Sequence, residues 1–356
     1  MSDSGVGFGG FLLGLGAGWY LFQYIDFSFD LIGYLLILMG IGMILNGLLN
    51  RGRRQHPISG IFGGVLGGLI LATFLTQGFG IVTSITNEFT GFPIGGYRAS
   101  ETFTLNSPVT VNAVDLSIDS VNGALDVHSW SGNSVKFEVE VKARGDTTSE
   151  AENNLADFTH DLRSQVSGGV QDVSLSFPIP TSEWNKYSVN IAVYVPSDVS
   201  ADYNLDTTNG AITFTEILGE NIILSTTNGA ITLTDLEAPV INVETTNGAI
   251  RGTVTSQAAR FHTTNGGIDV TLSKISGKHS FSTTNGGIDI NLPTGSDVGY
   301  KVNLDTGIGS VGVNLSNMDY SVNTARTKIG ETSSYSSKAI QIEITANVSI
   351  GGININ

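Results

Sequence analysis

The stretch STTNGAITL, Ser225–Leu233, returns four more times in nearly the same letters. The other copies are DTTNGAITF, ETTNGAIRG, HTTNGGIDV and STTNGGIDI, which begin at Asp206, Glu244, His262 and Ser282. Aligned on Thr-Thr-Asn-Gly, the asparagines are Asn209, Asn228, Asn247, Asn265 and Asn285, at steps of 19, 19, 18 and 20 residues. A nearly fixed period of about 20 residues indicates stacked supersecondary units.

Apolar and polar residues alternate within each copy, which is typical of a strand with one buried face. The third residue after the asparagine is isoleucine in all five copies: Ile212, Ile231, Ile250, Ile268 and Ile288. Two architectures fit this pattern. A meander of antiparallel hairpins would turn at each Asn-Gly pair, whereas a β-solenoid would use each copy as one coil, stacked in parallel on the preceding coil.

The uniformity of the columns favours the solenoid. In a parallel stack, identical positions lie over one another at a spacing of about 4.8 Å. Isoleucine then contacts isoleucine inside, and the asparagines form an amide ladder at the corner. A meander gives no reason to keep one column uniform. We also expect the glycine after each asparagine to supply the positive φ of a sharp corner.

The pattern extends beyond the five copies. IDSVNGALDV, Ile118–Val127, has the same phase, which adds Asn122 to the predicted corner ladder. VNLDTGIGSVGV, Val302–Val313, has the pattern of a degenerate late coil. The repeat pattern is interrupted only between Asn122 and Asn209. There, strand-like alternation surrounds a segment whose apolar residues have a different spacing.

That segment, residues 147–166, has the period of an amphipathic helix. The apolar residues of its stripe are Ala151, Leu155, Phe158 and Leu162. A helix of this kind can cover an open end of a solenoid, which otherwise invites further strand addition. The sequence therefore predicts a β-solenoid domain over residues 101–356 with one capping helix near residues 147–166.

Three apolar runs without a charged residue open the chain. Each is long enough, at about 18 residues or more, to predict a membrane-spanning helix, and the runs lie at about residues 8–25, 31–49 and 58–82. A cleaved signal peptide is the alternative for the first run, but no basic segment precedes it and no small-residue cleavage site follows. The runs carry glycines at four-residue spacing. These glycines either mark a helix-pairing face or reflect the frequency of glycine in membrane helices.

The short loops predict the orientation of these helices. The loop between the second and third runs carries Arg51, Arg53 and Arg54, whereas the loop between the first and second carries only acidic charges. Because Lys and Arg favour the cytoplasmic side, we expect the N-terminus inside and residues 101–356 outside the cell membrane, after a linker at 83–100. Three arginines are fewer than a site for anionic lipid usually has, so we interpret them as a topology signal.

The charge balance restricts the class of partner. The formal net charge is −15, and residues 101–356 hold 28 acidic against 13 basic residues. Nucleic acid is a poor partner for such a surface. The expected partners are the lipid bilayer and a membrane or envelope protein, contacted through the glycine-faced helices or the solenoid surface; self-association stays open. The chain has no cysteine, which excludes disulfides and thiol chemistry.

The sequence offers few candidates for chemistry. No two histidines have the i, i+4 spacing of a metal pair, and His262 and His279 fall in different columns of neighbouring coils. Asp269 and Asp289 share a column, and stacked carboxylates suit a hard cation such as calcium. The surrounding residues lack the spacing of calcium-binding nonapeptide repeats. We therefore expect no catalytic residue and no cofactor, and Asp269 and Asp289 are weak metal candidates.

The region from about Phe103 to the C-terminus resembles the putative-adhesin family of single-stranded right-handed β-helices, also described as toastrack-like domains. The resemblance rests on the order of strand, helix, two strands ending in VYVPSDVSADYNL (Val193–Leu205), serial TTNG coils and the DINLP step (Asp289–Pro293). Glycine-rich membrane helices ahead of such a domain are similar to the architecture of LiaF-like envelope-stress proteins. The resemblance implies a scaffold, sensor or adhesin at the cell envelope and brings no established catalytic residues.

These observations predict a non-catalytic, multi-pass membrane protein whose right-handed β-solenoid faces outward. Three functions remain open: an envelope-stress sensor or protein scaffold, an adhesin for an external ligand, and a subunit that stacks end to end. The last depends on whether IQIEITANVSIGGININ, Ile340–Asn356, forms a covered or an open end.

Overall fold

The computed structural model describes residues 97–356 of the chain. The three predicted membrane-spanning segments, the arginine loop and residues 83–96 of the predicted linker lie outside the described residues. Within residues 97–356, no helix is long and apolar enough to cross a membrane.

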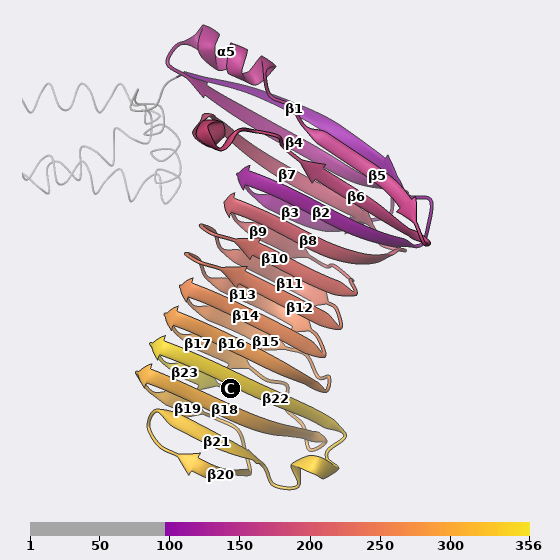
Figure 1. Ribbon diagram of the computed structural model, residues 1–356. Coiled ribbons are helices and arrows are strands. Elements are labelled where there is room, and N and C mark those ends of the chain that lie inside the picture. The colour runs from indigo at the N-terminus through magenta and orange to yellow at the C-terminus, as the bar shows by residue number, and fades with distance from the viewer. Residues whose placement is uncertain (1–96) are drawn as a thin grey trace, which may run out of the picture. The chain divides into compact units, whose positions relative to one another are not determined.

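Two β-sheets share one apolar core, and successive coils add one strand to each sheet (Figure 1). Within residues 97–356, sheet 1 has eleven strands in the spatial order β1 (Tyr97–Pro108), β4 (Ser134–Gly145), β7 (Tyr187–Pro196), β3 (Leu125–Trp130), β9 (Ile212–Thr215), β11 (Ile231–Glu237), β13 (Ile250–Thr255), β15 (Ile268–Leu272), β17 (Ile288–Asn291), β23 (Ile353–Ile355) and β19 (Val311–Val313). In the same range, sheet 2 has twelve: β20 (Met318–Asn323), β21 (Thr327–Thr332), β18 (Val298–Ile308), β22 (Ile340–Ile350), β16 (Gly277–Asn285), β14 (Ala258–Asn265), β12 (Val240–Thr245), β10 (Asn221–Thr226), β8 (Ser200–Asn209), β2 (Ala113–Asn122), β6 (Val170–Ser176) and β5 (Asp161–Ser167).

The repeats stack in parallel, as the uniform columns predict. In sheet 1, Ile231 of β11 is in register with Ile212 on one side and Ile250 on the other, and all three are buried. In sheet 2, the rings of Phe261 and Phe281 stack with centroids 5.2 Å apart on neighbouring parallel strands. A hairpin meander would have opposed different positions of the repeat. The prediction of a β-solenoid is therefore confirmed, and the alternative of a meander is wrong.

The corner glycines have a different role from the expected one. Gly123 has a positive φ of 139°, but the glycines of the five TTNG copies do not lie in the positive-φ region. Instead, neighbouring coils approach closely at this corner, so that a Cβ atom on Gly229 would lie 1.8 Å from the carbonyl oxygen of Gly210. For these copies the expectation of positive φ was wrong, because glycine is required by the approach of two backbones rather than by its own conformation.

The last coil of the chain is not the last coil of the stack. Strand β22 pairs in parallel with β16 on one side and with β18 on the other, and β23 lies between β17 and β19. The chain thus leaves one coil position empty after β17, builds the degenerate late coil as β18 and β19, and returns to fill the position (Figure 1). Ile340–Asn356 is covered on both sides.

Both ends of the stack depart from the coil pattern. At one end, β18 pairs antiparallel with β21, which pairs antiparallel with β20. At the other end, the helix α5 (Thr148–Ala156) packs against β1 and β4. Two 3₁₀ helices complete the described elements, η1 (Thr181–Lys186) and η2 (Tyr335–Ser337).

The capping helix is shorter than the predicted residues 147–166. Its N-cap is Thr147, whose hydroxyl accepts the N–H of Glu150 at 3.1 Å, and the helix ends at Ala156. Residues 161–167 form β5, which pairs antiparallel with β6 through a turn at Gly168 and Gly169, with φ of 60° and 87°. Two consecutive residues of positive φ are typical of a tight hairpin turn, so the second half of the predicted helix is instead a strand of a hairpin.

Candidate functional site

The six corner asparagines form a continuous ladder along the edge of the stack. Each side-chain amide donates to the Oδ1 atom of the preceding coil's asparagine: Asn209 to Asn122 at 2.6 Å, Asn228 to Asn209 at 2.7 Å, Asn247 to Asn228 and Asn265 to Asn247 at 2.8 Å, and Asn285 to Asn265 at 2.9 Å. The ladder thus joins coils separated by 18 to 20 residues, and at its start by 87.

The first threonine of TTNG is equally committed to the contact between coils. Thr245 is buried, and its hydroxyl donates to the carbonyl oxygen of Gly229 at 2.9 Å. Thr263 donates in the same way to Gly248 at 2.9 Å. Threonine, asparagine and glycine of the motif therefore each serve the stacking of one coil on the next. The repetition is explained by this structural role.

Asp269 and Asp289 lie side by side on the outer face of sheet 1, where β15 and β17 pair. Arg251 occupies the next position of the column beside Asp269, and the amide of Asn354 donates to Oδ1 of Asp289 at 2.7 Å. Within residues 97–356, no group of three or more histidine, aspartate or glutamate side chains is placed to hold a metal ion. A cation at this pair would have two carboxylates as ligands and a guanidinium as a neighbour, so we propose no metal site there.

His262 and His279 lie on opposite faces of sheet 2. His262 is on the outer face, and its Nδ1 shares a hydrogen bond with Oγ of Ser282 at 2.7 Å. His279 points into the core, where its side chain is 4% exposed and its Nδ1 has no hydrogen-bond partner among the described residues. Burial lowers the pKa of His279 to about 4, so that it is neutral at physiological pH.

An acidic column crosses the outer face of sheet 2 near its first coils. Asp115 is in register with Asp172 on one side and Asp202 on the other. Partial burial and the charges of Asp202 and Asp172 raise the pKa of Asp115, and burial with the charge of Asp206 raises that of Asp119. Sequence reasoning missed this column, because Asp115, Asp172 and Asp202 are far apart in the chain and lie outside the TTNG copies.

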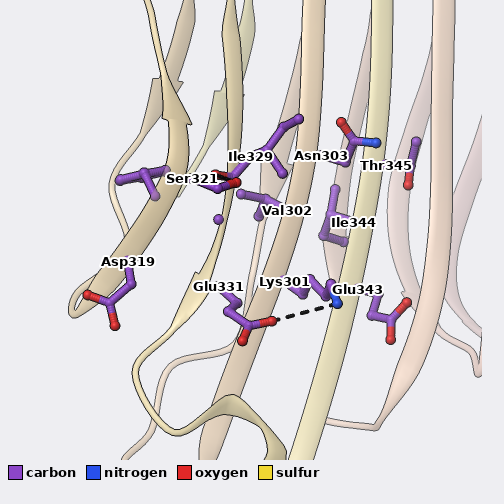
Figure 2. Close-up of a pocket in the computed structure, with 12 residues that line it drawn as sticks. Lys301, Val302, Asn303, Asp319, Ser321, Ile329, Glu331, Glu343, Ile344 and Thr345 are labelled. Atoms are coloured by element: carbon purple, nitrogen blue, oxygen red, sulfur yellow. Dashed lines mark hydrogen bonds and ion pairs between the residues drawn. The ribbon is translucent and has the colours of Figure 1, made fainter.

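A groove of about 720 Å³ lies where the β20–β21 hairpin meets the outer face of β18 and β22. Figure 2 shows Lys301 and Asn303 of β18 beside Glu343 and Thr345 of β22, with Asp319 at the β20 side. The dashed line in Figure 2 joins Nζ of Lys301 to Oε2 of Glu331, 3.6 Å apart.

Three of the four charged residues that line the groove, Lys301, Glu331 and Glu343, are in ion pairs, whereas the carboxylate of Asp319 accepts a hydrogen bond from the hydroxyl of Ser333. In addition to the Lys301–Glu331 pair, Nζ of Lys278 lies 3.1 Å from Oε2 of Glu343. Ile329 of β21 lines the groove with 37% of its surface exposed. Sequence reasoning missed the groove, since the hairpin that forms it lies outside the repeat and carries no motif.

Comparison with known proteins identifies the family. The model of the Toastrack DUF4097 family matches residues 110–355. The chain belongs to this family. The toastrack resemblance drawn from the order of the strands, the helix and the TTNG coils is thereby confirmed, whereas its LiaF-like part concerns helices outside the described residues. No curated protein matches this toastrack protein.

Several solved structures are similar to the toastrack domain. One is a putative cell adhesion protein from Clostridium sporogenes ATCC 15579, with 13% identity, coverage of 72% of this chain and 99% of that chain, and a TM-score of 0.37. A putative adhesin from Bacteroides fragilis NCTC 9343 has 12% identity, coverage of 72% and 97%, and a TM-score of 0.35. A putative lipid binding protein from Parabacteroides distasonis ATCC 8503 has 13% identity, coverage of 72% and 97%, and a TM-score of 0.29. At these values the names of the three proteins say nothing about the function of this chain.

Proposed function

We propose that this protein is a non-catalytic, membrane-anchored toastrack solenoid that acts outside the cell membrane as a protein scaffold or envelope-stress sensor. We propose further that its protein partner binds the groove between the β20–β21 hairpin and β18–β22. The observation that supports this site is the contrast between the groove and the repeats. The repeats use their distinctive side chains to hold coil to coil, whereas the hairpin departs from the coil pattern and forms a concave surface.

The anchoring part of the proposal rests on the sequence. The apolar runs at residues 8–25, 31–49 and 58–82 are each long enough to span a bilayer. The loop with Arg51, Arg53 and Arg54 then sets the orientation with the domain outside. The domain carries the groove at the end of the stack opposite to α5.

The chemistry of the groove favours a protein partner over a reacting substrate. Its lining residues include no histidine, and the hydroxyl of Ser321 donates to the carbonyl oxygen of Ile329 at 3.1 Å. The Lys301–Glu331 and Lys278–Glu343 pairs are solvent-exposed. Each such pair contributes at most about 1 kcal/mol, so charged side chains of a partner can replace one member at little cost.

Site-specific photocrosslinking in native membranes tests the proposed groove. A photoreactive phenylalanine analogue at Asn303 lies inside the groove, and the same analogue at Thr232 lies on the outer face of sheet 1 as a matched control. We expect a discrete protein adduct from position 303 and none from position 232. Equal adducts from both positions, or none from 303, would contradict the proposal.

End-to-end stacking is a weaker alternative. The segment Ile340–Asn356 lies inside the stack, and β18 is followed by an antiparallel hairpin rather than by an open parallel strand. The parallel register therefore cannot continue from β18 into a second molecule without displacement of the hairpin. Adhesion to an external ligand has one specific observation in its favour, a second pocket at the other end of the stack.

A further inference from the structure

The second pocket, of about 620 Å³, lies where the 3₁₀ helix η1 meets the start of the asparagine ladder. It is far along the stack from the groove, and β7, which follows η1, is separated from β23 and β19 by several coils of sheet 1. The polar and aromatic side chains of its lining include Arg144, Thr181, Ser182, Trp184, Asn185 and Ser188. Nothing in the proposed scaffold function uses this pocket.

Two arginines oppose each other beside the pocket. Arg98 of β1 and Arg144 of β4 are directly paired across the antiparallel ladder, and both side chains are exposed. Like charges in such a position repel each other and destabilise the sheet. Among the ion pairs of residues 97–356, neither arginine has a carboxylate partner. In a domain with a large excess of acidic residues, this pair of free guanidinium groups is unexpected.

The other basic side chains nearby are neutralised. Nζ of Lys142 lies 2.9 Å from Oε1 of Glu140, and Nζ of Lys186 lies 3.4 Å from Oε1 of Glu183. The pocket therefore does not lie in a broad basic surface. Its positive charge is concentrated on Arg144 and Arg98, which is the arrangement that suits a single anionic group.

The pocket also holds polar groups without partners. The side chains of Thr181, Ser182, Asn185 and Ser188 make no hydrogen bond within the part of the chain that the structure describes. Asn122 differs, because its amide donates to the carbonyl oxygens of Trp184 and Tyr187 at 2.5 and 3.2 Å. Three hydroxyls and one amide are thus free to bind a ligand that carries many hydroxyls.

The aromatic side chains of the pocket have their polar atoms engaged. Nε1 of Trp184 donates to the carbonyl oxygen of Ile179 at 3.0 Å, and the hydroxyl of Tyr187 donates to the carbonyl oxygen of Asn154 at 2.9 Å. The indole of Trp184 is half-buried, so part of its ring remains open to a ligand. A partly exposed aromatic ring beside convergent polar groups is typical of a small-molecule site.

We propose that this pocket binds an acidic saccharide. The guanidinium groups of Arg144 and Arg98 receive its carboxylate or phosphate, the free hydroxyls and the Asn185 amide hydrogen-bond to sugar hydroxyls, and Trp184 packs against the apolar face of the ring. A long polyanion is disfavoured, because the acidic surface beyond the pocket repels it. The ligand is therefore a short acidic sugar or the end of a glycan chain.

Saturation-transfer NMR on the full-length protein, in a zwitterionic detergent without sugar groups, tests the proposal. The probes are glucuronic acid and glucose 6-phosphate, with glucose as the neutral match and inorganic phosphate as the free anion. We expect the two acidic sugars to bind more tightly than glucose and phosphate. The double variant Arg98→Gln, Arg144→Gln should weaken their binding at least tenfold.

Two further variants separate the pocket from general charge and from folding. Lys142→Gln removes one positive charge from the same face and should change affinity less than twofold. Trp184→Leu should also weaken sugar binding. The melting temperature of the double arginine variant should stay equal or rise, because the repulsion between Arg98 and Arg144 is removed. Three results would each overturn the proposal: no binding of either acidic sugar at millimolar concentration, unchanged binding in the double variant, or phosphate binding as tight as that of glucose 6-phosphate. Because crosslinking at Asn303 reports on the other groove, the two proposals fail independently.

Discussion

Gly266 and Gly248 occupy the same corner of adjacent coils, and a Cβ atom on Gly266 would lie 1.9 Å from the carbonyl oxygen of Gly248. Gly267, the next residue, has its nearest neighbour at 3.5 Å, the carbonyl oxygen of Gly287. Gly266→Ala must therefore push two coils apart, whereas Gly267→Ala fits. We expect a cost of about 2–4 kcal/mol in the free energy of unfolding for Gly266→Ala and less than about 1 kcal/mol for Gly267→Ala. Equal costs in denaturant unfolding would contradict the close approach of the coils.

The asparagine ladder predicts a graded effect along the stack. Asn247 donates to Asn228 and accepts from Asn265, whereas Asn285 donates to Asn265 and ends the ladder. Since each exposed hydrogen bond contributes about 0.5–1 kcal/mol, Asn247→Ala should cost about twice as much as Asn285→Ala. Thermal unfolding of the two variants measures the difference. A larger loss for Asn285→Ala would show that the ladder is not what holds this corner.

His279 predicts a loss of stability in weak acid. Its pKa in the folded state is lowered to about 4 by burial, below the ordinary value of 6.5. The unfolded chain therefore binds a proton that the folded chain does not, and stability falls as the pH drops below about 6.5. Between about pH 7 and pH 5 the loss should be about 2 kcal/mol. The raised pKa values of Asp115 and Asp119 act in the opposite direction, because the folded chain then holds protons that the unfolded chain has released.

Denaturant titrations at the two pH values check this prediction. His279→Leu should remove the loss, because a neutral apolar side chain fills the same inward position. His262→Leu, on the outer face of the same sheet, is the matched control and should retain it. If both variants keep the wild-type pH dependence, the inward histidine is not its source.

The inserted C-terminal coil predicts that the chain end holds the last coils in place. Removal of residues 340–356 from the full-length protein deletes β22 and β23, which lie between β16–β17 and β18–β19. Amides of β18 should then exchange rapidly with deuterium, while those of β10 and β12 stay protected. A synthetic peptide of residues 340–356 should restore the protection of β18. Full protection of β18 in the truncated chain would contradict the observed strand order.

The coil positions could be predicted from the sequence, but their order in space could not. The column of Ile212, Ile231 and Ile250 predicts parallel stacking, because a uniform column has a physical use only in that arrangement. No residue in Ile340–Asn356 indicates that it enters between two earlier segments, since an inserted coil needs the same inward apolar pattern as a terminal one. The period of the repeats can be recognised from neighbouring residues, whereas the order of the strands at the ends of the stack depends on contacts between segments distant in the sequence.

The end of the helix was predicted wrongly and the two pockets were not predicted at all, for related reasons. Phe158 and Leu162 fit a helical stripe, yet both pack against the core from a loop and a strand after α5 has ended. The pocket at Arg144 and the groove at Lys301 each combine several separate segments of the chain. Neither has a motif, because their residues are brought together only by the caps at the two ends of the stack.

Thiol labelling tests most directly whether a membrane anchor holds the toastrack solenoid outside the cell membrane, as we propose. The chain has no cysteine, so any label on a variant with a single cysteine at position 232 or 53 is attached to that cysteine. In intact cells, a membrane-impermeant thiol reagent should label Thr232→Cys, while Arg53→Cys should be labelled only after the membrane is permeabilised. Labelling of Arg53→Cys in intact cells, or protection of Thr232→Cys, would contradict this topology.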